Sequence, residues 1–252
     1  MACFFFDLDG TFLDSNHKIL DSTMGAIARL RAAGHIVAIN TGRSYLGTCP
    51  ILEQTQIEYA IVDGGMTIYH RHQKVSEQAL DRDFVKRLYF ECQSLEIDIV
   101  LANDIVARIK DDRYKNNITA DHPWLSFESI IDEDNFDDVK KIFIFVDEIQ
   151  AGNILVLQEV NYLYLEKTKG IVTDQNCKYQ GIAKLVEYFG LEKSATVSFG
   201  DSNNDIEMLE KCDIGVAMAN ATDAAKKASD IVTDSNDDDG IYRALMKLGF
   251  ID

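Results

Sequence analysis

The first cluster of polar residues that could do chemistry is Asp7-Leu8-Asp9-Gly10-Thr11. Two carboxylates at positions i and i+2 after a strand can point towards one cavity, where one acts as a nucleophile or metal ligand and the other exchanges protons. Gly10 allows a sharp departure from the strand that a side chain would hinder. Taken alone, an Asp-Gly sequence more often forms a simple turn, so its chemistry depends on what lies around it.

Three further clusters could complete such a site. Asn40-Thr41-Gly42-Arg43 offers a hydroxyl, backbone N–H groups and a guanidinium, which suit a phosphate or another oxyanion. Lys178 adds a positive charge, and the acids and amides of Gly200-Asp201-Ser202-Asn203-Asn204-Asp205 are hard oxygen ligands for Mg²⁺. Each cluster also has a plain structural interpretation, because Thr41 and Asp205 can cap helices and a lone lysine usually lies on the surface.

A short apolar strand is expected directly before the first, second and fourth clusters. Open α/β sheets bind ligands at the carboxyl ends of their strands, so these clusters would meet at one edge. Alternation of strands and helices predicts a Rossmann-like α/β core with a parallel sheet covered on both faces. The expected strands are Cys3–Phe6, Ile36–Ile39, Ala60–Val62, Thr67–Tyr69, Thr196–Phe199, Ile214–Val216 and Ile231–Val232; the expected helices are Ile19–Ala32, Gly181–Tyr188 (just after Lys178), Asp205–Lys211, Ala221–Ala228 and Ile241–Leu248.

The middle of the chain has a looser pattern, which indicates a separate α+β domain inserted into the core. The core would comprise residues 1–80 and 174–252, and the inserted domain residues 81–173. Consecutive strands and grouped helices are typical of α+β units. The expected elements are a helix at Phe84–Ser94, a helical stretch at Ala151–Val160, and strands at Asp98–Leu101, Ile105–Ile109, Ile142–Val146 and Tyr162–Glu166.

The composition argues against several classes of partner. The net charge of −17 in 252 residues repels phosphate backbones and anionic lipid, so nucleic-acid and membrane-surface roles are disfavoured. The five cysteines form no CxxC pair, which favours reduced thiols. The first residues lack the basic leader of a signal peptide, and the apolar runs are too short to span a bilayer. We therefore expect a cytoplasmic protein, while the oligomeric state stays open.

The four clusters together resemble the motifs of the haloacid dehalogenase (HAD) superfamily, in particular its Cof-type sugar-phosphatase branch. The DxDGT signature corresponds to Asp7–Thr11 and the second motif to Thr41–Arg43. Lys178 lies twelve residues before Gly190, as the third-motif lysine of the branch does, and the GDxxND motif corresponds to Gly200–Asp205. The inserted domain is similar in position and size to a type IIB cap. One departure is Asp63-Gly64-Gly65, where the branch often has Asn-Gly-Ala.

The resemblance implies a phosphatase that forms an aspartyl phosphate on Asp7. Asp9 would first protonate the leaving oxygen and then deprotonate the attacking water. The expected substrates are small phosphorylated metabolites, and sugar phosphates are the first candidates among them. The implied Mg²⁺ ligands are Asp7, the backbone carbonyl of Asp9, and Asp201; the implied substrate or phosphate contacts are Thr41, Gly42, Arg43 and Lys178; and Asn204 and Asp205 would orient the metal waters and Lys178.

Other interpretations use the same residues. Phosphomutases related to this family transfer the phosphoryl group to a second sugar hydroxyl on a similar core. A non-catalytic acidic metal-binding protein is a weaker alternative, since no acidic loop fits the EF-hand pattern. In the inserted domain, His122 and Trp124 are conceivable substrate contacts, although a structural role in that domain's own core is the simpler interpretation.

Overall fold

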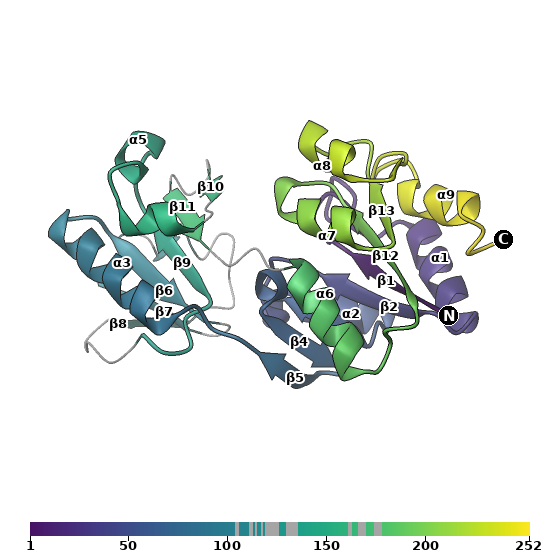
Figure 1. Ribbon diagram of the computed structural model, residues 1–252, viewed down its shortest axis with the longest axis horizontal. Coiled ribbons are helices and arrows are strands. Elements are labelled where there is room, and N and C mark those ends of the chain that lie inside the picture. Colours follow the sequence, from purple (N-terminus) through teal and green to yellow (C-terminus); the bar gives the residue numbers. More distant parts are fainter. Residues whose placement is uncertain are drawn as a thin grey trace. The chain divides into compact units, whose positions relative to one another are not determined.

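The computed structural model of the protein describes residues 1–103, 106–110, 113, 115, 116, 118, 126–129, 136–160, 163–165, 170–173 and 178–252. It divides the chain into two compact units. The first unit contains residues 1–43, 48–76 and 177–252, and the second contains residues 44–47 and 77–176. Each unit is built on its own sheet (Figure 1). No helix within the described ranges is long and apolar enough to cross a membrane.

The first unit is an eight-stranded sheet with the strand order β14-β13-β12-β1-β2-β3-β4-β5. The strands from β14 to β3 pair in parallel, whereas β4 runs antiparallel to β3. The predicted parallel sheet is thus correct for the centre but not for the edge, where a short turn joins β3 to β4. The strands are β1 (Ala2–Phe6), β2 (Ile36–Asn40), β3 (Tyr59–Val62), β4 (Thr67–His70), β5 (Gln73–Glu77), β12 (Ala195–Gly200), β13 (Ile214–Ala217) and β14 (Ile231–Val232).

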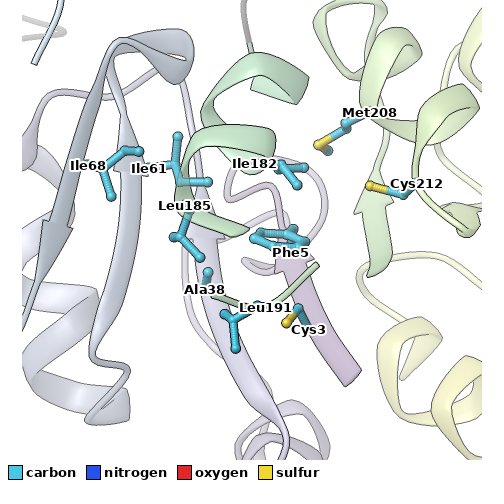
Figure 2. Packing of buried hydrophobic residues seen from close by; sticks show 10 residues of the cluster. All are labelled: Cys3, Phe5, Ala38, Ile61, Ile68, Ile182, Leu185, Leu191, Met208 and Cys212. Atoms are coloured by element: carbon cyan, nitrogen blue, oxygen red, sulfur yellow. The ribbon is translucent and has the colours of Figure 1, made fainter. Parts of the chain in front are cut away.

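Strand β1 lies at the centre of this sheet, between β12 and β2, and all five of its residues are buried. Because side chains alternate along a strand, its sequence must be apolar on both faces. On one face, Figure 2 shows Cys3 and Phe5 packed in a cluster with residues of two helices. On the other face, the rings of Phe4 and Phe250 meet edge to face at 4.8 Å. Two helices therefore contribute to the cluster on one face of the central strand, and the C-terminal segment at Phe250 packs on the other.

The helices around this sheet largely follow the predicted amphipathic pattern. An additional helix, α2, contains Pro50 in its interior, where a proline removes a backbone donor and normally disfavours a helix; the sequence analysis did not predict it. The helices are α1 (Asp21–Ala32), α2 (Tyr45–Thr55), α6 (Lys178–Tyr188), α7 (Ile206–Lys211), α8 (Asp223–Ala228) and α9 (Gly240–Lys247), with short 3-10 turns η1 (Asp63–Gly65) and η4 (Asn203–Asp205).

The second unit contains a six-stranded sheet with the order β10-β11-β9-β6-β7-β8. Most neighbours are antiparallel, with β7 and β8 as a parallel pair. Its apolar core includes Val100, Phe143 and Ile118. The elements are α3 (Arg82–Ser94), β6 (Ile99–Ala102), β7 (Val106–Ile109), β8 (Ser126–Ser129), β9 (Lys141–Ile144), α5 (Glu148–Ala151), η3 (Val156–Glu159), β10 (Leu163–Leu165) and β11 (Gly170–Thr173).

The predicted helix at Ala151–Val160 is wrong. The chain instead forms α5, which ends at Ala151, and the separate turn η3, which begins at Val156. Gly152 follows α5 at once, and glycine is a poor helix former. The carboxylate of Glu91 on α3 then accepts hydrogen bonds from the backbone N–H groups of Leu155 (2.7 Å) and Val156 (2.8 Å). This long-range contact stabilises the break, and no local sequence pattern predicts the contact.

Candidate active site

Three neighbouring strands of the first unit bring the polar clusters together. Asp7 directly follows β1, Thr41 follows β2, and Asp201 follows β12. Because β12, β1 and β2 are adjacent and parallel, their carboxyl ends lie at the same edge of the sheet. The backbone N–H of Asp7 continues the ladder by donating to the carbonyl of Phe199 at 3.0 Å. Residues almost 200 positions apart therefore meet at this edge.

Lys178 is the buried cation of the site. Its Nζ donates to Asp7 Oδ1 and to Asp205 Oδ1, each at 2.6 Å, and its side chain is only 1% exposed. The predicted helix start near Gly181 is wrong, since α6 begins at Lys178 itself. Asn40, buried at the end of β2, donates from Nδ2 to the carbonyl of Lys178 at 3.2 Å and so ties the start of α6 to the sheet.

Asp201 is held beside Asp7 by the loop that carries the first motif. Thr11 donates from its hydroxyl to Asp201 Oδ1 at 2.8 Å. Gly10 has a φ of +84°, and a Cβ on it would lie 2.5 Å from Asp201 Oδ2. Only glycine therefore fits both the backbone conformation and the approach of the carboxylate. On its other side, the Gly10 carbonyl accepts a hydrogen bond from Asn220 Nδ2 at 2.7 Å.

Asp205 has two duties at the start of the short helical segment after β12. Its Oδ1 binds Lys178, while its Oδ2 accepts hydrogen bonds from the backbone N–H groups of Asp201 (3.0 Å) and Ser202 (2.9 Å). Its predicted capping role and its predicted contact with Lys178 thus occur together. Asn204 lies in the same turn, where its Oδ1 accepts a hydrogen bond from Ser202 Oγ at 2.5 Å.

The site has more negative than positive charge. Carboxylate oxygens of Asp7, Asp201 and Asp205 lie within 4.8 Å of one another, and Lys178 supplies one ammonium group against the three acids. Burial raises the pKa of Asp7 to about 8 in spite of Lys178, with further upward contributions from Asp205 and Asp201. Burial also raises the pKa of Asp201 to about 6, against the hydrogen bond from Thr11.

These acids fit a divalent cation. When all three carboxylates are ionised, they and one ammonium leave two surplus negative charges at a largely buried place. Burial, together with the repulsion between the acids, raises the pKa values of Asp7 and Asp201. Hard carboxylate oxygens are the ligands that Mg²⁺ and Ca²⁺ prefer. Asp7 and Asp201 are the better candidates to bind such an ion, because Lys178 and Thr11 bind only Oδ1 of these residues, whereas Asp205 already uses both oxygens on Lys178 and on backbone N–H groups.

Asp9 is more exposed than these three acids. Its side chain is 49% exposed, and both of its oxygens accept hydrogen bonds from Arg43: Nε to Oδ2 at 2.8 Å and Nη2 to Oδ1 at 2.5 Å. His17 Nδ1 lies 3.7 Å from Asp9 Oδ1. Asp9 and Arg43, each named separately by the sequence analysis, therefore form one fork-shaped pair.

The loop after β2 is fixed by a second loop after β3. Thr41 is buried, and its Oγ1 accepts a hydrogen bond from the N–H of Arg43 at 3.1 Å, so its hydroxyl proton can still be donated. The N–H of Asp63 donates to the carbonyl of Arg43 at 2.9 Å, and the N–H of Gly64 donates to that of Thr41 at 3.0 Å. Asp63 adopts a left-handed φ of 54°, which asparagine and aspartate tolerate better than most residues.

The sequence analysis assigned no part to Thr11, Asn40 or Asn220, which support the site through Asp201, Lys178 and Gly10. Thr11 lies inside the first motif, and Asn40 is a polar residue directly after an apolar run. The position of each residue in the sequence therefore indicated a possible role at the site. Nothing in the sequence around Asn220 pointed to Gly10. His122 and Trp124 lie outside the described residues.

Comparison with known proteins adds three findings. Residues 4–245 match the family model of the haloacid dehalogenase-like hydrolases. A 5-amino-6-(5-phospho-D-ribitylamino)uracil phosphatase of Bacillus subtilis (strain 168), YitU, is 29% identical over 257 residues, covering 95% of this chain and 94% of YitU. A solved structure of the HAD subclass IIB sugar phosphatase BT4131 is 25% identical, covers 100% of both chains and has a TM-score of 0.83. The predicted fold class is confirmed.

Proposed function

The chain belongs to the haloacid dehalogenase-like hydrolases and is a phosphatase; we propose that it depends on Mg²⁺ and works through an aspartyl phosphate on Asp7. The observation that supports this proposal is the group formed by the buried Asp7 and Lys178 with the half-buried Asp201, which brings two carboxylates and an ammonium together at one edge of the sheet. Small phosphorylated metabolites are the proposed substrates.

Asp7 is the proposed nucleophile because it is the buried acid at the end of the central strand. Its oxygen forms a bond to phosphorus, and the bond from phosphorus to the leaving oxygen breaks. A carboxylate nucleophile divides one difficult displacement into two easier ones. Lys178 holds Asp7 Oδ1 at 2.6 Å and keeps the carboxylate in one orientation.

Asp9 is the proposed acid and base. It gives a proton to the leaving oxygen in the first step, and in the second step it takes one from the water that attacks phosphorus and releases Asp7. A single group can serve twice because the second step regenerates the proton used in the first. Its exposure of 49% leaves it open to a leaving group and to water, unlike Asp7.

The remaining motif residues are proposed to hold the metal and the phosphate. Asp7, Asp201 and the backbone carbonyl of Asp9 would bind Mg²⁺, which when bound offsets the repulsion between the Asp7 carboxylate and the phosphoryl oxygens. Asn204 and Asp205 would orient the metal waters and Lys178. The groups proposed to contact the phosphoryl oxygens, where charge spreads in the transition state, are the Thr41 hydroxyl, the N–H of Gly42 and Lys178.

The proposed substrate class is a phosphate ester on a polyhydroxy carbon chain. Three relatives of Bacillus subtilis are named for a phosphoribitylamino compound, and BT4131 is described as a sugar phosphatase. A sugar phosphate and a phosphoribityl chain share a phosphate on a chain of hydroxyl-bearing carbons. Residues 81–173 are proposed to act as the cap domain that contacts the carbon chain of the substrate, as lids do in enzymes that exclude water.

The decisive experiment traps the intermediate. Asp9→Asn should still be phosphorylated by p-nitrophenyl phosphate with Mg²⁺, because nitrophenolate leaves without a proton, but it should lose the base of the second step. Intact-mass spectrometry is expected to show one added phosphoryl group that hydroxylamine removes. Asp7→Asn should show neither this adduct nor turnover, and a wild-type-like rate for that variant would exclude Asp7 as the nucleophile.

A further inference from the structure

We propose that Arg43 is a positioning residue that aims the Asp9 carboxylate for proton transfer, an inference that rests on the proposed function. The sequence alone suggested a different part for Arg43, a direct contact with the substrate. In the structure two donors of its guanidinium are instead engaged by the two oxygens of Asp9, at 2.8 and 2.5 Å. This arrangement is the bidentate fork in which arginine binds a carboxylate in a defined plane.

The backbone of Arg43 gives this fork a fixed origin. Its N–H donates to Thr41 Oγ1 at 3.1 Å, and its carbonyl accepts from the N–H of Asp63 at 2.9 Å. Thr41 is itself tied to β3, since its N–H donates to the carbonyl of Ile61 at 2.9 Å. The backbone of Arg43 is thus anchored to the loops that follow β2 and β3, whereas Asp9 lies in the loop that follows β1.

Asp9 needs such a restraint more than the other acids of the site. Asp7 and Asp205 are buried and bound to Lys178, but the Asp9 side chain is half exposed and would otherwise sample several rotamers. His17, 3.7 Å from Asp9 Oδ1, is 75% exposed and gives little restraint. Ion pairs at the surface contribute about 1 kcal/mol or less to folding stability, whereas the two-point contact of this pair fixes the plane of the Asp9 carboxylate.

The fork is compatible with the proton transfers proposed for Asp9. An ionised carboxylate has about four acceptor positions, and the guanidinium occupies two of them. The remaining positions can hold the proton that passes to the leaving oxygen and later receive one from water. Arg43 enters neither bond-forming step, so its contribution is geometric. Misplacing a catalytic group by about 1 Å can cost on the order of 100-fold in rate.

The test compares two classes of leaving group in Arg43→Met. kcat/KM reports the steps up to departure of the leaving group, for which glycerol phosphate needs a proton and p-nitrophenyl phosphate does not. If Arg43 acts through Asp9, kcat/KM for glycerol phosphate should fall roughly 100-fold. For p-nitrophenyl phosphate it should stay within about threefold of wild type, because no proton is transferred before that leaving group departs.

Two further variants test the coupling directly. Arg43→Lys keeps the charge but offers a point donor in place of the fork, so it should recover only part of the loss on glycerol phosphate. The double variant Asp9→Asn/Arg43→Met should be no slower on glycerol phosphate than Asp9→Asn alone, because the positioned group is already missing. Arg71→Met is the matched control, since Arg71 pairs with Glu58 at 3.1 Å elsewhere on the same unit, and it should leave both substrates unaffected.

Equal losses of kcat/KM on the two substrates in Arg43→Met would overturn the inference and assign Arg43 to the transferred phosphoryl group. Additive losses in the double variant would overturn it as well. Both results are compatible with an inactive Asp7→Asn, so they leave the proposed function standing. An active Asp7→Asn removes the proposed function instead, whatever Arg43 does. A urea midpoint of Arg43→Met close to that of wild type shows that the comparison is made on folded protein.

Discussion

The charge balance around Lys178 makes a quantitative prediction about the stability of the metal-free protein. The Lys178→Met substitution keeps most of the apolar stem but removes an ammonium group that donates to two buried carboxylates at 2.6 Å each. Hydrogen bonds to charged groups contribute about 1.5–3 kcal/mol each, and breaking a buried ion pair costs about 3–5 kcal/mol. The two hydrogen bonds together give a loss of about 3–6 kcal/mol, which overlaps the range of about 3–5 kcal/mol for the ion pair and is a large part of the stability of an ordinary domain.

The assay is urea unfolding in EDTA, followed by circular dichroism at several pH values. The loss should be smallest near pH 5, because protonation of Asp7 and Asp201 relieves the uncompensated charge, and should grow towards pH 8. Adding Asp7→Asn to Lys178→Met should recover part of the lost stability, because it removes one of the two carboxylates that have lost their cation. This rescue keeps the test informative even if Lys178→Met alone fails to fold.

Lys211→Met is the matched control. Lys211 lies in the same unit and pairs with Glu207 at 2.7 Å, nearly the distance found at Lys178, but its side chain is 51% exposed. Its removal should leave the urea midpoint close to that of wild type, because exposed ion pairs within a helix are screened by water. If the two substitutions shift the midpoint equally, burial does not set the strength of the Lys178 contacts, and the electrostatic reasoning about the site is refuted.

Three further predictions follow from the same site. Asp201→Ala should chiefly raise the Mg²⁺ concentration needed for half-maximal hydrolysis, by about tenfold or more; an unchanged metal titration would remove Asp201 from the ligand set. Gly10→Ala should lower the free energy of unfolding by about 1–2 kcal/mol, because φ is +84° and the new Cβ would meet Asp201 Oδ2 at 2.5 Å. The control is Gly25→Ala in α1, where a Cβ meets nothing within 4 Å, and it should be neutral or stabilising. Equal urea midpoints for the two variants would contradict the argument. Finally, the folded-state pKa of Asp7, about 8, lies above its ordinary value of 3.8, so the stability it contributes is complete below pH 4 and is lost as the pH rises through 8. Thermal unfolding in EDTA should show this decline, and Asp7→Asn should remove it; an identical pH profile in that variant would show that Asp7 is not its source.

The sequence by itself determined which residues carry the chemistry. The apolar run before Asp7 has to be buried on both faces of a sheet, and an acidic, hydroxyl-rich or glycine-containing cluster directly follows three such runs. Strand ends in an open α/β sheet meet at one edge, so local patterns were sufficient to place Asp7, Thr41 and Asp201 together. The amphipathic helices of the core were also predicted, to within a few residues at their ends.

Only the tertiary structure decided how these residues are paired. The family resemblance implied that Asp205 orients Lys178, but no local pattern shows that Lys178 also binds Asp7, or that Arg43 binds Asp9. Each contact depends on side-chain directions set by packing elsewhere. The same holds for the helix that accommodates Pro50 and for the break after Ala151, which the distant Glu91 carboxylate stabilises. Local sequence fixes the identity of chemical groups and their periodicity, whereas distances between groups far apart in the chain arise only once the core has packed.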